Sequence, residues 1–147
     1  MSLFFLIFAK DMEVLFEKNF ARISYETDKD LMFLELIGNI KHENYKETFD
    51  TLLEFAAQKS IKKLLVNQAT LEKSGMDSKA WLITSWLPRV KKTLGEDIKV
   101  ALILAKNLFT KIGGEYVVGA VRMISKFEVR TFSSLDDGRA WLMKGEE

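Results

Sequence analysis

The sequence predicts an α/β fold with elements in the order β-β-α-β-α-β-α-β-α. Two strand-like runs, at residues 20–26 and 31–37, are joined by a short polar turn, which indicates an antiparallel hairpin. Three further apolar runs, at residues 62–67, 99–105 and 127–132, alternate with segments of helical period. Alternating βα units require right-handed crossovers, so we expect a five-stranded, mostly parallel sheet with the antiparallel hairpin at one edge and helices packed on it.

The hairpin is predicted from the alternation of apolar and polar side chains across Phe20–Glu26. Asp28-Lys29-Asp30 supplies the turn, and the apolar run Leu31–Ile37 forms the second strand. Val14–Glu17 either extends the first strand or pairs beside it.

Three helices are predicted from apolar residues that recur with a helical period. The first, Lys41–Lys59, has one apolar face, made of Tyr45, Phe49, Leu52, Leu53 and Ala56. The second, Asp77–Thr93, is stopped by Gly95, and the third is Leu108–Ile124. A short final helix carrying Trp141 follows Ser134, because Ser134 and Asp137 match the serine and acid of a capping signature.

Composition limits the classes of protein that this chain can belong to. Of its 147 residues, 48% are apolar and 29% charged, with 22 basic and 21 acidic side chains. These values fit one globular domain, expected over residues 12–147, and give no basic face for nucleic acid. The chain has no cysteine, which excludes disulfides, thiolate nucleophiles and cysteine-bound metals.

Residues 1–11 form an apolar N-terminal extension. The run Leu3–Ala9 is shorter than the roughly 20 residues of a membrane span, and Met1-Ser2 lacks the basic charge of a secretory signal. Either the natural protein starts at Met12, or the run packs as a strand or short helix. In the second case it is expected to bury itself on another subunit and drive a homodimer. With no such targeting segment, the expected compartment is the cytoplasm.

Several short stretches along the chain point to a known superfamily. They are Ile37-Gly38 with Tyr45, Leu64-Leu65-Val66-Asn67, Trp81 with Trp86-Leu87-Pro88-Arg89, Phe132-Ser133-Ser134-Leu135, and Ala140-Trp141-Leu142. With the element order, they resemble the SpoIIAA-like superfamily, which includes STAS domains and the CRAL-TRIO lipid-carrier domains. The resemblance covers residues 12–142 and is greatest to small bacterial stand-alone STAS-like proteins of unassigned function. It implies a SpoIIAA-like fold.

STAS domains of anti-sigma-factor antagonists carry a phosphorylatable serine in an Asp-Ser-Ser/Thr-Gly motif after the third strand. In this chain Ser74-Gly75 and Asp77-Ser78 are fragments of that motif, out of order and in a longer loop. A phosphate there would be favoured by the free N–H groups and the dipole of the next helix. The simpler interpretation is that Asp77 or Ser78 is the N-cap of that helix.

Pro88 lies inside the predicted helix 77–93, where it removes a backbone hydrogen bond and crowds the preceding turn. The helix therefore kinks there, or two shorter helices meet. Trp81 and Trp86 precede the break and Arg89 follows it. These side chains form either an aromatic-walled groove with a cationic lip, or two tryptophans packed on the sheet beside cations that complement a helix C-terminus.

Other candidate sites are weaker. Gly113-Gly114 predict a helix break or a close backbone approach that would open a path to a cavity, and the following residues lack the Lys-Ser/Thr of a phosphate loop. His42, the one histidine, is expected at the surface. No triad, zinc site or paired carboxylates are indicated, so no metal and no cofactor are expected.

Two functions follow as hypotheses. The first is a non-enzymatic STAS-like regulatory or protein-interaction module that binds an unidentified partner through residues 69–76 and the helix behind them. The second is a small apolar-ligand (lipid-like) binding protein resembling CRAL-TRIO carriers, which a cavity of roughly 300 Å³ or more would support. The candidate binding residues are Ser74, Asp77, Ser78, Trp81, Trp86, Arg89, Gly113 and Gly114. For an enzyme, a perturbed carboxylate or lysine in a cleft would be the first sign.

Overall fold

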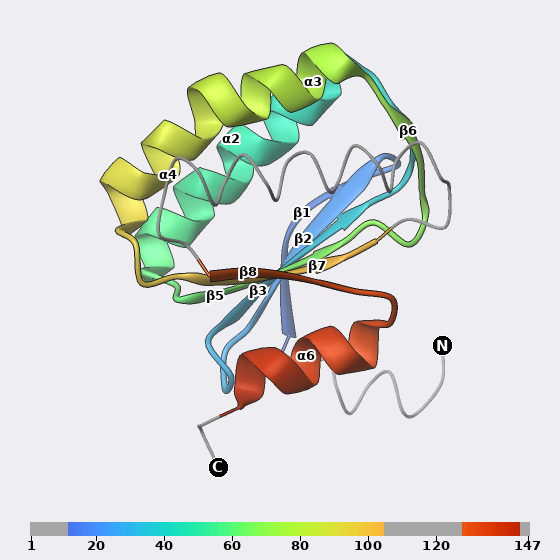
Figure 1. Cartoon of the computed structure of the whole chain (residues 1–147). Coiled ribbons are helices and arrows are strands. Elements are labelled where there is room, and N and C mark those ends of the chain that lie inside the picture. Colours follow the sequence, from blue (N-terminus) through green and yellow to red (C-terminus); the bar gives the residue numbers. More distant parts are fainter. Residues whose placement is uncertain (1–11, 105–127, 145–147) are drawn as a thin grey trace.

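A computed structural model describes residues 12–104 and 128–144 of the chain (Figure 1). Its main sheet has six strands in the order β1-β2-β3-β5-β7-β8. These strands are β1 (Met12–Lys18), β2 (Ala21–Glu26), β3 (Leu31–Leu36), β5 (Lys63–Asn67), β7 (Lys99–Ile103) and β8 (Glu128–Phe132). The predicted α/β class and parallel sheet are confirmed, but the count of five strands is wrong.

The sixth strand arises at the N-terminal edge of the sheet. A turn at Asn19-Phe20 reverses the chain, so β1 pairs antiparallel beside β2 rather than extending it. The strand β2 pairs antiparallel with β3, and every pair from β3 to β8 is parallel. Val14–Glu17 therefore does not extend the first predicted strand but belongs to a separate edge strand that pairs beside it.

Helices cover both faces of the sheet. Figure 1 shows α2 (His42–Lys59), α3 (Met76–Trp81) and α4 (Leu87–Leu94) on one face and α6 (Leu135–Met143) on the other. The strand β3 is buried on both sides: Met32 and Leu34 belong to the larger core under α2 and α4, whereas Leu31 and Phe33 belong to the smaller core under α6. This two-sided burial explains why the parallel strands are nearly continuous apolar runs.

The break predicted at Pro88 takes the form of a wide helical turn. Between α3 and α4 the residues Leu82–Trp86 form a π-helix, η1, and the N–H of Leu87 donates to the carbonyl of Leu82. Pro88 is then the second residue of α4, where its missing N–H costs little. Two α-helices therefore meet through a π-turn, a type of insertion that often occurs at functional sites.

A second, smaller sheet was not predicted. It pairs β4 (Gly38–Ile40) with β6 (Leu71–Ser74) in parallel. Gly38 has a φ of 68°, which a residue without a side chain adopts freely, and its N–H donates to the carbonyl of Thr70 at 2.8 Å. The short sheet ties the segment after β5 to the segment after β3, and it fixes the position of Ser74.

The final helix begins as predicted, because the hydroxyl of Ser134 accepts from the N–H of Asp137 at 3.2 Å. Two contacts attach α6 to the sheet. At Gly138 a Cβ atom would lie 2.6 Å from Cδ1 of Ile103. Arg139 Nη2 lies 2.6 Å from both carboxylate oxygens of Glu26, which is buried at the end of β2.

Some of the sequence-based predictions fall outside the described residues. They are the extension of residues 1–11 with its run Leu3–Ala9, the helix Leu108–Ile124, and the glycine pair Gly113-Gly114.

Candidate functional site

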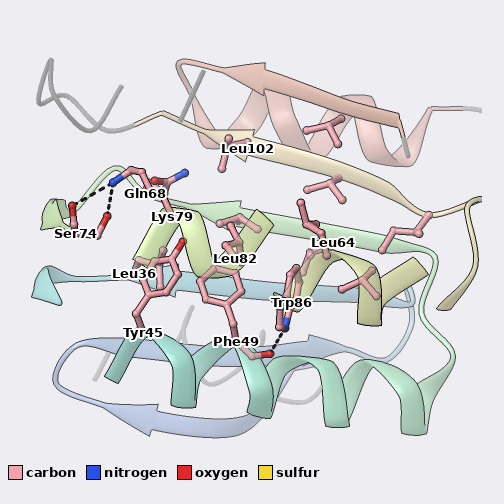
Figure 2. Close-up of a pocket in the computed structure, with 16 residues that line it drawn as sticks. Leu36, Tyr45, Phe49, Leu64, Gln68, Ser74, Lys79, Leu82, Trp86 and Leu102 are labelled. Carbon is pink, nitrogen blue, oxygen red and sulfur yellow. Dashed lines mark hydrogen bonds between the residues drawn. The ribbon is translucent and has the colours of Figure 1, made fainter. Parts of the chain in front are cut away.

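A pocket lies between the larger helical layer and the parallel strands (Figure 2). It is partly open, with about 90 Å³ of space for the centres of water-sized molecules and about 790 Å³ of atom-free space when the open solvent at its mouth is counted. The described residues that line it are Leu36, Tyr45, Phe49, Leu64, Val66, Gln68, Ser74, Lys79, Leu82, Trp86, Leu87, Val90, Ile98, Val100, Leu102 and Val129. Most of this lining is apolar.

Aromatic rings from two helices form one wall of the pocket. Tyr45 and Phe49 follow each other on α2 with ring centroids 4.7 Å apart, and Phe49 meets Trp86 edge-on at 5.0 Å. The indole Nε1 of Trp86 donates to the carbonyl of Phe49 at 2.7 Å, which fixes the ring in the wall. Tyr45 is also buried, and burial raises the pKa of its hydroxyl above the ordinary value.

One end of the pocket is polar. Gln68 follows β5, Ser74 ends β6 and Lys79 lies on α3, so all three come from segments at the carboxyl edge of the sheet. Ligands of open α/β proteins bind outside this edge. Figure 2 shows the three side chains together, with the Lys79 ammonium bound to Ser74. Its Nζ donates to the Ser74 hydroxyl at 2.7 Å and to the Ser74 carbonyl at 3.1 Å.

Lys79 is an unusual residue because it is buried and yet forms no salt bridge. The residue is only 6% exposed, and no carboxylate pairs with it within the part of the chain that the structure describes. Lysines are rarely buried unless they are paired. Burial lowers the pKa of Lys79 below its ordinary value, since desolvation disfavours the charged form.

The start of α3 differs from the prediction. The helix is capped by Gly75 rather than by Asp77 or Ser78, so its cap lies two or three residues earlier than predicted. Gly75 is extended, with φ −75° and ψ 160°, because it directly follows the strand β6. The Asp77 carboxylate instead lies over this first turn and accepts from the N–H of Ser78 at 2.9 Å.

Ser78 and His42 join the starts of α2 and α3. Ser78 is fully buried, and its hydroxyl lies 2.9 Å from Nδ1 of His42. His42 is expected at the surface, and its side chain is 34% exposed. The same ring nitrogen is 3.8 Å from Asp77 Oδ2, so both partners face one nitrogen and the arrangement is not a catalytic triad.

The two tryptophans of the predicted groove lie at different places in the structure. Trp86 lines the pocket, whereas Trp81 is half-buried and edge-on to Tyr45 at 6.4 Å, and it is not among the residues that line the pocket. Arg89 forms an ion pair with Asp50, and its guanidinium carbon lies 5.9 Å from the Trp81 ring centre. Trp81 and Arg89 therefore form a separate surface, and Gly113 and Gly114 are outside the described residues.

Lys79, Gln68 and Tyr45 are pocket residues that the sequence analysis did not select. A signal for Lys79 was present: it precedes Leu82 by three residues and Trp86 by seven, which puts a charge on the apolar face of the helix. The positions of the other two depend on how distant segments meet. In the described ranges no group of histidine and acidic side chains fits a metal, and none of the helices described is long and apolar enough to cross a membrane.

The six-stranded sheet with its antiparallel edge and two helical layers defines an α/β protein. A solved structure with this architecture is that of an uncharacterized protein from the DUF3478 family with a SpoIIAA-like fold, from Shewanella loihica PV-4. The similarity covers 89% of this chain and 91% of that one, with a TM-score of 0.53 and 17% sequence identity. It confirms the predicted fold. No protein-family model and no curated protein matches the sequence.

Proposed function

We propose that this protein is a non-enzymatic STAS-like module that binds a small amphipathic molecule in the pocket under η1 and α4. The observation that carries the proposal is the pocket itself: an apolar cavity with a few polar groups gathered at one end is the usual form of a small-molecule site. The aromatic wall and Leu64, Leu82 and Leu102 supply the apolar contacts.

The size of the pocket limits the ligand. The space open to water-sized centres, about 90 Å³, is below the roughly 300 Å³ at which pockets for drug-sized molecules begin, and so is too small for a membrane lipid. The ligand that we propose is accordingly shorter than a membrane lipid, with one acyl chain or one aromatic ring inside the pocket. This narrows the hypothesis of a CRAL-TRIO-like carrier to a binding protein for short apolar groups.

The pair Ser74 and Lys79 also bears on the question of an enzyme. A buried lysine in a cleft is a sign of an enzyme, and the 2.7 Å between Lys79 and Ser74 is the hydrogen-bond distance of a serine nucleophile activated by a lysine. However, the Asp77 carboxylate lies over the first turn of α3, where its Oδ1 would be 2.3 Å from a Cβ on Gly75. A negative charge opposes an oxyanion at these backbone N–H groups, so the geometry supports binding rather than acyl transfer.

A protein-interaction module is the second candidate. Met76, which is 63% exposed, stands beside residues 69–75 at the start of α3, and the half-buried Trp81 lies on the same helix. These side chains would give a partner protein an apolar contact in the region selected from the sequence. The cytoplasmic location and the homodimer stay predictions.

The test uses 1-octanol, a neutral molecule with one short chain. We expect it to change the fluorescence of Trp86 saturably in the native protein. Leu102→Phe fills the pocket and is expected to weaken octanol binding at least tenfold, whereas Leu135→Phe, on the α6 face, is the matched control and binds as the native protein does. Urea unfolding establishes that both variants are folded. The absence of saturable binding, or equal binding by Leu102→Phe, would refute the proposal and favour the protein-interaction module.

A further inference from the structure

We infer that the pocket selects molecules with a single carboxylate, which binds at the polar end between Lys79, Ser74 and Gln68. This inference rests on the proposed function and adds the chemical class of the ligand. It is carried by a juxtaposition: a buried ammonium group, with no acidic partner among the residues that the structure describes, lies at the polar end of an otherwise apolar pocket (Figure 2).

The Lys79 ammonium has a hydrogen-bond donor that Ser74 does not use. An ammonium has three N–H donors, and Ser74 accepts two of them through its hydroxyl and its carbonyl. One donor is left for a ligand. Because the Ser74 hydroxyl accepts from Lys79, its own proton is free to be donated as well. Gln68 adds an amide to the same end of the pocket. The donors that remain match the acceptors of one carboxylate.

The charge of Lys79 has no counter-ion among the described residues. Burying an ammonium without a counter-ion is costly, because the lost hydration is not replaced by a nearby negative charge. The acidic residue at the start of α3, Asp77, lies toward His42 and the helix N-terminus, and its side chain is 68% exposed. The pocket thus has a positive charge that the described protein groups leave uncompensated, and an anionic ligand would supply the compensation. Desolvation lowers the pKa of Lys79 and so disfavours its charged form, whereas a bound carboxylate would stabilise the ammonium.

The number of cations in the pocket favours a carboxylate over a phosphate as the ligand group. A phosphate dianion is usually held by several cations or by a bidentate arginine. Among the described residues that line the pocket, Lys79 is the one cation, and Arg89 is bound to Asp50 outside the pocket. One positive charge balances one carboxylate. The inferred ligand is therefore a monocarboxylic acid whose short apolar chain extends along Phe49 and Trp86.

The experiment compares octanoate with 1-octanol, which has the same chain length and no charge. In the native protein we expect octanoate to bind at least tenfold more tightly than octanol. Lys79→Met removes the charge and keeps a long apolar side chain. It is expected to lose at least tenfold in octanoate affinity while octanol binds as well as before or better. Lys73→Met removes one exposed positive charge from the neighbouring strand β6, and it is expected to leave both affinities unchanged.

The outcomes separate the two proposals. Equal affinities for octanoate and octanol, or an octanoate affinity that Lys79→Met leaves unchanged, would overturn the inference of a carboxylate ligand while octanol binding still supports the proposed function. An equal loss in Lys73→Met would also overturn it, since the effect would then be one of overall charge. If neither compound binds the native protein, both proposals fail. Octanol binding by Lys79→Met also establishes that the variant has an intact pocket.

Discussion

Replacing Arg139 by methionine is expected to destabilise the protein by about 2–4 kcal/mol. Arg139 lies 2.6 Å from both oxygens of Glu26, whose side chain is 7% exposed, whereas that of Arg139 is 26% exposed. Removing one partner of a fully buried ion pair costs about 3–5 kcal/mol, because the other charge stays buried alone. We lower this range because a quarter of the arginine side chain is in contact with solvent.

The same geometry predicts an order among variants. Glu26→Gln is expected to cost less than Arg139→Met, about 1–2 kcal/mol, because the guanidinium left behind can reach water. Replacing both residues by methionine is expected to restore stability to within about 1 kcal/mol of the native protein. The measurement is urea unfolding followed by tryptophan fluorescence. As a control, Arg22→Met removes the ion pairs of a 45% exposed arginine with Glu17 and Glu35 and should cost less than about 1 kcal/mol.

Three results would contradict this reasoning. One is an Arg139→Met variant that is no less stable than Arg22→Met. Another is a Glu26→Gln variant that is less stable than Arg139→Met. The third is a double variant that is as unstable as Arg139→Met alone, since the cost would then come from lost packing rather than from an unpaired carboxylate.

Two further predictions concern Tyr25 and Trp86. The Tyr25 hydroxyl donates to Asp30 at 2.5 Å, and this hydrogen bond raises the pKa of Tyr25 to about 12. The stabilising contribution of the bond is therefore complete below pH 10 and is lost as the pH rises from 10 to 12. Tyr25→Phe should be less stable than the native protein at pH 8, and a difference that does not shrink by pH 11.5 would count against the hydrogen bond. Trp86→Phe removes the 2.7 Å hydrogen bond to the Phe49 carbonyl and leaves a small cavity, which should lower the free energy of unfolding in urea by about 2–3 kcal/mol. An equal loss of stability in Trp81→Phe, at a half-buried position on the preceding turns, would show that the hydrogen bond is not the cause.

Periodic patterns explain why much of the fold was predictable. The strand β2 and the helix α2 each have a repeat of apolar residues long enough to be recognised, and the parallel strands are recognised as continuous apolar runs. The cap at Ser134 was also predictable, because its signature spans four adjacent residues. In contrast, β4 and β6 have three and four residues, too few for any period to show, and each exists because it pairs with the other.

The site was less predictable because its contacts join distant parts of the chain. Glu26 and Arg139 are 113 residues apart, and His42 and Ser78 are 36 apart. In the sequence Glu26 has the position of an outward-facing polar residue in an alternating strand, and the local pattern does not show that Arg139 of α6 lies against it. Trp86 was selected as one of a pair with Trp81, but a pattern of two aromatic residues does not tell which one faces the sheet.

The short sheet of β4 and β6 has a consequence for the thermodynamics of binding. A lysine side chain has about 2 kcal/mol of rotamer entropy, which it loses when it is held in one geometry. Here Ser74 is held by the β4–β6 pairing and holds the Lys79 ammonium in turn, so that entropy is lost when the chain folds. An anion that enters the pocket would bind an ammonium that is already immobilised, so its association would order few additional side-chain bonds.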